Sequence, residues 1–169
     1  YSDEVMTGFE YAASSLMLCE GMENEAVNCV NAVRDRYDGK KRNPFNEIEC
    51  GSYYARAMAS YAFLLAYSGF SCDMTEGKLS FNPIKGGECS FFWSVDGAWG
   101  TFKRSKNEVT VDVLYGNIDL NELYLPFVKG VSEVSLNGNI VKFKFIDGAV
   151  VINAKLKAGD SITVKGEIL

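Results

Sequence analysis

The feature that most limits how this chain can fold is a change in the spacing of its apolar residues near Gly69. Before this point they recur every three to four positions, as on one face of a helix. After it they alternate with polar residues, as in a strand with one buried face. We therefore expect an α+β chain with helices first and an antiparallel β meander or sandwich second. The boundary is expected near Pro83–Gly87, which gives domains 1–86 and 87–169.

Three helices are expected in the first half. The first begins at Thr7-Gly8-Phe9-Glu10, a capping-box pattern in which the threonine and glutamate side chains bond free backbone amides, and it ends at Gly21. The second spans about Glu23–Tyr37 and has one apolar and one charged face. The third, about Ser52–Tyr67, is apolar on every side, so we expect protein to enclose it.

Turn residues divide the strands of the second half. The pairs are Asp96-Gly97, Asn137-Gly138 and Asp147-Gly148. The hairpin around the first pair carries both tryptophans, Trp93 and Trp99. Hairpin tryptophans either form a platform for carbohydrate or pack on an adjacent domain, and we expect the second here.

Composition argues against several functions. The 169 residues carry a net charge of −5, which argues against a nucleic-acid partner. The absence of histidine removes His-dependent nucleophilic catalysis and His-ligated metal sites. The five cysteines include no Cys-x-x-Cys pair, so we expect free and mostly buried thiols and no metal. No apolar run has the length needed to span a membrane, and the sequence does not indicate a compartment.

One charged side chain stands alone in the third helix. Arg56 is the only charged residue between Tyr53 and Phe70, and a buried guanidinium needs a carboxylate or a polar ligand. Helical side chains lean toward the N-terminus, so Arg56 should point at the preceding loop, which carries Glu47 and Glu49. A carboxylate and a guanidinium together can bind vicinal sugar hydroxyls. The alternative is an internal Glu49–Arg56 salt bridge.

The stretch RNPFNEIECGSYYARAMASYAFLLAYSGF resembles the carboxy-terminal signature of glycoside hydrolase family 116, which includes non-lysosomal glucosylceramidases and bacterial β-glucosidases. EVMTGFEYAASSLMLCEGM and AVRDRYDG resemble the same family in the same order, and FFWSVDGAWGTF does so more loosely. The resemblance implies helices from an (α/α)6-toroid catalytic domain together with a β-sandwich domain. It also implies retaining hydrolysis of β-linked glycosides.

The resemblance further implies roles for individual residues. Glu47 and Arg56 match the residues that bind glucose hydroxyls in the −1 subsite, and Glu4 matches an acidic residue that lines the same subsite. Glu49 is then structural, neutralising the loop or capping the helix. Met6 departs from the tryptophan usual in the family. The nucleophile and acid/base of the family lie upstream of the matched part, so we assign no catalytic residue here and expect no cofactor.

We therefore expect the carboxy-terminal portion of a retaining β-glucosidase or glucosylceramidase-like hydrolase, inactive by itself. Its expected partners are glucose or a β-linked glycoside, and the remainder of the catalytic domain or a second copy of the chain. The first alternative is a stand-alone carbohydrate-binding or interaction module without catalysis. The second is a structural domain in which Arg56 is paired entirely inside the protein.

Overall fold

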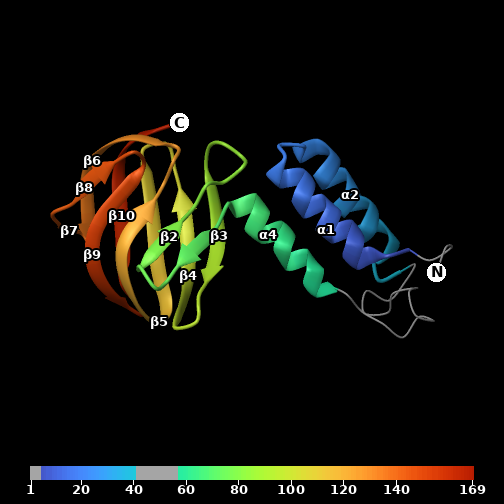
Figure 1. The fold of residues 1–169 in the computed structure, drawn as a ribbon, viewed down its shortest axis with the longest axis horizontal. Coiled ribbons are helices and arrows are strands. Elements are labelled where there is room, and N and C mark those ends of the chain that lie inside the picture. The colour runs from blue at the N-terminus through green and yellow to red at the C-terminus, as the bar shows by residue number, and fades with distance from the viewer. Residues whose placement is uncertain (1–4, 41–56) are drawn as a thin grey trace. The chain divides into compact units, whose positions relative to one another are not determined.

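The chain forms two compact units, Tyr1–Tyr67 and Ser68–Leu169. The computed structural model describes residues 5–40 and 57–169 (Figure 1). About 45% of the described residues lie in strands, and these residues contain three short α-helices and no helical toroid. The fold is therefore mostly β. The expected α+β chain with toroid helices is wrong, because strand residues outnumber helical ones among the described residues and the strands begin soon after Gly69, within the part expected to be helical.

The helical unit is built from short elements. They are α1 (Thr7–Cys19), α2 (Glu23–Arg36), the 3-10 helix η1 (Ala57–Ala59) and α4 (Ser60–Ser68). The first two helices contact each other, and each contributes fully buried apolar side chains such as Leu18 and Val33. Gly21, with a φ of 77°, allows the tight turn between them. The expected apolar stripe of the second helix is confirmed, because Ala26 and Val33 are buried. That of the first helix is wrong, because Phe9 and Leu16 are exposed.

The expected capping box does not form. The N-cap of α1 is Met6, and no side chain caps this end. Instead, the Thr7 hydroxyl donates a hydrogen bond to the Tyr37 hydroxyl at 3.5 Å, and Glu10 pairs with Arg36. Tertiary partners at the end of α2 have therefore replaced the local backbone partners.

The third expected helix is not enclosed by the described residues. Large side chains of η1 and α4 are exposed, with Met58 at 79%, Tyr61 at 66% and Leu65 at 50%. One contact of α4 with α2 is polar: the Tyr67 hydroxyl donates to Glu23 at 2.8 Å. The apolar character of this segment is therefore not explained by burial within the described part of the chain.

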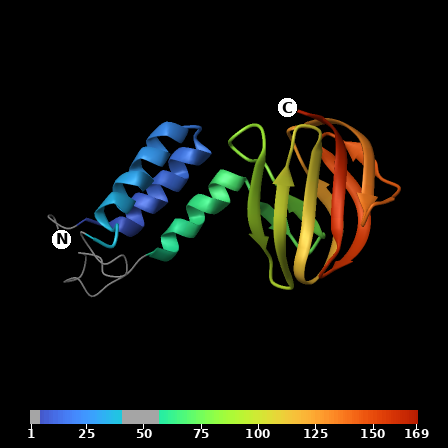
Figure 2. The same ribbon diagram turned by 180° about the vertical axis from the view of Figure 1, so that it is seen from behind.

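Ten strands form the second unit. They are β1 (Ser71–Asp73), β2 (Lys78–Ser80), β3 (Cys89–Ser94), β4 (Ala98–Arg104), β5 (Glu108–Tyr124), β6 (Val128–Leu136), β7 (Asn139–Ile140), β8 (Lys144–Ile146), β9 (Ala149–Lys157) and β10 (Ser161–Ile168). The long β5 belongs to two halves of the sheet. One half has the order β3-β4-β5-β10-β6-β7 (Figure 2), and the other contains β1, β2, β5, β9 and β8.

The pairing differs from the expected meander. Among the described strands, β2 pairs with β5 in parallel, and the other pairs are antiparallel. This unit also includes β1 and β2, which lie within the expected first domain of residues 1–86. Phe81, which follows β2, stacks on Phe102 of β4 with ring centroids 4.3 Å apart. The segment after Ser68 therefore contributes to the core of the strand unit.

Gly116 lies where β5 passes from one half of the sheet to the other. Its φ is 76°, and a Cβ at this position would lie 2.0 Å from the carbonyl oxygen of Gly97. Val111 before it and Leu120 after it are both fully buried in the same hydrophobic core. The two halves of the sheet therefore enclose one core.

The three predicted turns are confirmed. Asn137-Gly138 joins β6 to β7 and Asp147-Gly148 joins β8 to β9, with positive φ at all four residues. Two residues with positive φ define the hairpin turn whose twist matches that of the strands. The Asp96-Gly97 turn joins β3 to β4, and Val95 donates its backbone N–H to the Ala98 carbonyl at 2.9 Å.

Candidate functional site

The four residues expected around the sugar lie outside the described residues. Glu4 falls in the range 1–4, and Glu47, Glu49 and Arg56 fall in the range 41–56. Their roles stay predictions. The structure does describe the chain that follows Glu4 and the chain that follows Arg56, and these two segments contact each other through α1 and η1.

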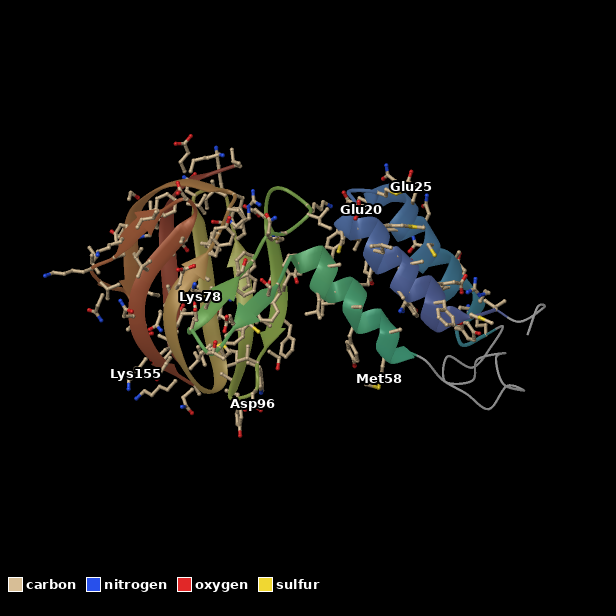
Figure 3. The ribbon with its side chains drawn as sticks, viewed as in Figure 1. Glu20, Glu25, Met58, Lys78, Asp96 and Lys155 are labelled. Atoms are coloured by element: carbon tan, nitrogen blue, oxygen red, sulfur yellow. The ribbon has the colours of Figure 1, made fainter. Side chains whose placement is uncertain are left out.

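An open pocket of about 350 Å³ lies where these segments meet. Its lining consists of apolar residues: Gly8, Phe9, Ala12, Met58 and Ala59. Gly8 follows Glu4 by four residues, and Met58 follows Arg56 by two. The Met58 side chain projects from the beginning of this helical segment (Figure 3). The pocket therefore brings together the two segments of the chain that lead to the expected sugar-binding residues.

Two polar contacts between these helices are structural. The Arg36–Glu10 pair joins α2 to α1, and its side chains are 28% and 31% exposed. At the end of α4, the hydrogen bond to Glu23 raises the pKa of Tyr67, and burial raises it further. These contacts join the helices to one another. Glu10 directly follows Phe9 of the pocket, whereas Tyr67 lies at the opposite end of α4 from Met58.

Among the described residues, the carboxyl groups with altered pKa lie in the strand unit. Hydrogen bonds hold the pKa of Asp73, Asp112 and Asp160 below its ordinary value, in Asp112 against an opposing effect of burial. A general acid in glycoside hydrolysis needs a raised pKa. None of these three carboxyl groups therefore has the property of a catalytic acid.

The cysteines offer no metal site in the described part of the chain. Residues 5–40 and 57–169 hold no group of three or more side chains suited to a metal ion. Cys19, Cys29, Cys72 and Cys89 are free, as expected, but the first and third are exposed and the other two only partly buried. The expectation of mostly buried thiols is thus wrong for these four. Within the same described ranges, no helix has the length and apolarity that crossing a membrane requires.

The two tryptophans have different environments. Trp93 is 1% exposed and lies in the core of its own unit, where a Cβ at Gly100 would come within 2.9 Å of its ring. The expectation that it packs on an adjacent domain is therefore wrong. Trp99 is 39% exposed and contacts two further rings, those of Phe92 and Tyr115. Neither ring partner of Trp99 could be predicted from the sequence, because neither follows from spacing along one strand.

No family model matches the chain, and no curated protein matches it. Among solved structures, it is similar to the GH127 β-arabinofuranosidase BT3674, with 17% identity and a TM-score of 0.42, over 72% of this chain and 22% of that one. It is also similar to Ara127N-Se, a GH127 β-L-arabinofuranosidase from Geobacillus stearothermophilus T6. That comparison has 16% identity and a TM-score of 0.41 over 79% of this chain and 22% of that one.

This chain therefore spans about a fifth of the length of those two proteins. Both are glycoside hydrolases, and neither belongs to family 116. The expected assignment to family 116, and to a glucosylceramidase in particular, is not supported by these comparisons. At this level of similarity we transfer no residue role from either structure.

Proposed function

We propose that this chain is part of a glycoside hydrolase and that it supplies one wall of a sugar-binding subsite. The observation that carries the proposal is the pocket between the start of α1 and η1. It joins the segment that follows Glu4 to the segment that follows Arg56. An acid and a guanidinium beside an apolar surface suit a sugar, which has hydroxyl groups at its edge and C–H groups on its faces.

In this proposal, Glu47 and Arg56 bind the hydroxyls of a glucose unit in the −1 subsite. Glu4 lines the same subsite, and Glu49 stabilises the loop. The motif around Glu47 favours a β-glucosidase or glucosylceramidase type of substrate, and Met6 in place of an aromatic ring leaves a smaller stacking surface.

The catalytic carboxyl groups belong to another part of the enzyme. Retaining hydrolysis needs a nucleophile and an acid/base about 5 Å apart, with the pKa of the acid raised. The three described carboxyl groups with altered pKa are all shifted downward. The remainder of the catalytic domain, or a second copy of the chain, would then cover the exposed apolar side chains of α4.

A carbohydrate-binding module without catalysis is the second candidate. A different observation favours it: the strand unit encloses its own core and exposes three contacting aromatic rings on its surface. The two candidates differ in whether Glu47 is needed for glucose to bind.

Saturation-transfer NMR of the 169-residue chain with glucose tests the proposal, because it detects weak binding. We expect transfer to the sugar protons, and a roughly ten- to hundredfold loss of affinity in Glu47→Gln and Arg56→Gln, since each removes a charged hydrogen-bonding group. Glu25→Gln, an exposed glutamate on α2 (Figure 3), is the matched control and should bind as the parent does. No transfer with the parent, or equal transfer with Glu47→Gln, would overturn the proposal.

A further inference from the structure

Three aromatic side chains form a row on the outer surface of β3, β4 and β5. Phe92, Trp99 and Tyr115 are 50%, 39% and 62% exposed. The Trp99 centroid lies 5.9 Å from that of Phe92 and 5.8 Å from that of Tyr115. The row lies near the Asp96-Gly97 turn, the end of the β3–β4 hairpin labelled in Figure 3. We call these three residues the aromatic row.

A β-bulge directs Tyr115 outward. Trp99 is opposite Tyr115, but the next residue of β4, Gly100, is opposite Val113, so Leu114 is an extra residue on β5. Val113 is buried, and strict alternation would place Tyr115 on the same inner face. The bulge instead leaves Leu114 and Tyr115 both exposed. Bulges commonly redirect a side chain beside a functional site.

The side of Tyr115 away from Trp99 is open. The neighbouring chain on that side is the β9–β10 turn, where Ala158 donates to the Gly116 carbonyl and Gly159 to the Val113 carbonyl, both at 2.8 Å. These are the two smallest residue types, and they leave the Tyr115 ring the most exposed of the row. An aromatic face is therefore available to a ligand.

A polar cluster adjoins the row on the same outer face. Asp112 Oδ2 accepts hydrogen bonds from the Thr101 hydroxyl at 2.9 Å and from Lys103 Nζ at 3.1 Å. Thr101 is two residues from Trp99 on β4, so its side chain lies on the same side of the strand. The Asp112 and Lys103 side chains remain 22% and 58% exposed, and together they carry no net charge. The carboxylate can accept hydrogen bonds from sugar hydroxyls and the ammonium group can donate hydrogen bonds to them. Because the pair has no net charge, it does not favour an ionic ligand.

We propose that the aromatic row and the Asp112–Lys103 pair bind a neutral oligosaccharide of hexopyranose units. The C–H face of a sugar packs on the Tyr115 and Trp99 rings, and its hydroxyls reach the carboxylate and ammonium groups. This site is separate from the subsite proposed around Glu47, and it does not depend on it.

The size of the row favours a sugar over a protein partner. An aromatic side chain offers about 150–250 Å², so three rings at these exposures present on the order of 300 Å². A stable protein interface buries about 800 Å² on each partner. Leu114, which is 52% exposed beside Tyr115, adds to the apolar area of the row. The other outer positions around the row on β4, β5 and β10, among them Thr110, Thr163 and Lys165, are polar.

Acrylamide quenching of tryptophan fluorescence in the 169-residue chain tests the proposal, with cellohexaose as the probe. The chain has two tryptophans, and the buried Trp93 is inaccessible to the quencher, so the signal reports Trp99. We expect cellohexaose to protect Trp99, and Tyr115→Ala to weaken binding about tenfold or more. Tyr115→Phe keeps the ring and should keep binding, which separates loss of contact from loss of fold.

Tyr124→Ala is the matched control, because Tyr124 is a second partly exposed tyrosine on the same strand, at 39% against 62% for Tyr115. It should bind cellohexaose as the parent does, and so should Glu47→Gln. Absence of protection in the parent overturns the proposal. The proposal is also overturned if Glu47→Gln loses the protection and Tyr115→Ala keeps it, because the sugar would then bind at the subsite around Glu47. Self-association that Trp99→Ala abolishes, without any effect of sugar, would show a protein interface instead.

Discussion

The rings of Trp99 and Tyr115 lie 5.8 Å apart between centroids, with their planes inclined by 16°, at directly opposed positions of β4 and β5. Such pairs contribute about 0.5–1.5 kcal/mol beyond the area that they bury. A double-mutant cycle with Trp99→Ala and Tyr115→Ala, measured by urea unfolding, should give a coupling free energy in that range. Strictly additive effects on the free energy of unfolding would contradict the pairing.

Gly116 should be essential at the point where β5 passes from one half of the sheet to the other. Gly116→Ala places a Cβ 2.0 Å from the Gly97 carbonyl oxygen at a φ of 76°. We expect it to lower the free energy of unfolding by about 2 kcal/mol or more. Gly130→Ala is the control, because nothing lies within 4 Å of its Cβ, and its effect should stay within about 0.5 kcal/mol. Equal effects of the two substitutions would refute this role for Gly116.

Asp112 should make stability depend on pH in the acid range. Burial opposes ionisation, but hydrogen bonds from Ser161, Lys103 and Thr101 lower the pKa of Asp112 below its ordinary value of 3.8. Because the folded pKa is the lower one, the contribution to stability is complete above 3.8 and is lost as the pH falls through the folded value.

Chemical unfolding of the parent and of Asp112→Asn across this range is the measurement. The variant should be less stable at neutral pH and should lose less stability on acidification. Asp119→Asn, at an exposed position of the same strand, should follow the parent. A parent and an Asp112→Asn variant with parallel pH profiles would show that Asp112 is not the group responsible.

The exposed apolar side chains of the helical unit should promote association. Phe9 and Leu16 of α1 are 62% and 63% exposed, and Tyr61 of α4 is 66% exposed. We expect the 169-residue chain to associate with rising concentration in light scattering, and Tyr61→Ser to reduce this. Ile140→Ser, at a 73% exposed position of β7, should not. If the parent stays monomeric at all concentrations, this would count against the idea that another part of the enzyme or a second copy covers these apolar side chains.

Local signals allowed part of the fold to be predicted. Asn137-Gly138 and Asp147-Gly148 determine their own turns, because both positions of each need a positive φ. The capping box was wrongly predicted, because it depends on a side chain that has a non-local partner in the folded chain. Glu10 has a local partner in principle, but Arg36 on the next helix pairs with it.

The non-local features could not be predicted. The parallel pairing of β2 with β5 joins Leu79 to Leu123, and no periodicity in either segment indicates it. The bulge at Leu114 is visible only once β4 is aligned beside β5, so Tyr115 was not recognised as a neighbour of Trp99. For the expected subsite around Glu47, the structure describes only the residues before 41 and after 56. The pocket at Gly8 and Met58 depends on the contact of α1 with η1, which no local sequence pattern indicates.

Saturation transfer from the chain to glucose, compared between the parent and Glu47→Gln, tests the central claim most directly. The account predicts transfer that Glu47→Gln lowers in the parent and removes in a Tyr115→Ala background. It also predicts that Tyr115→Ala alone keeps transfer, because the aromatic row is a separate site. Transfer of equal strength in the parent and in Glu47→Gln, or none in either, would contradict it.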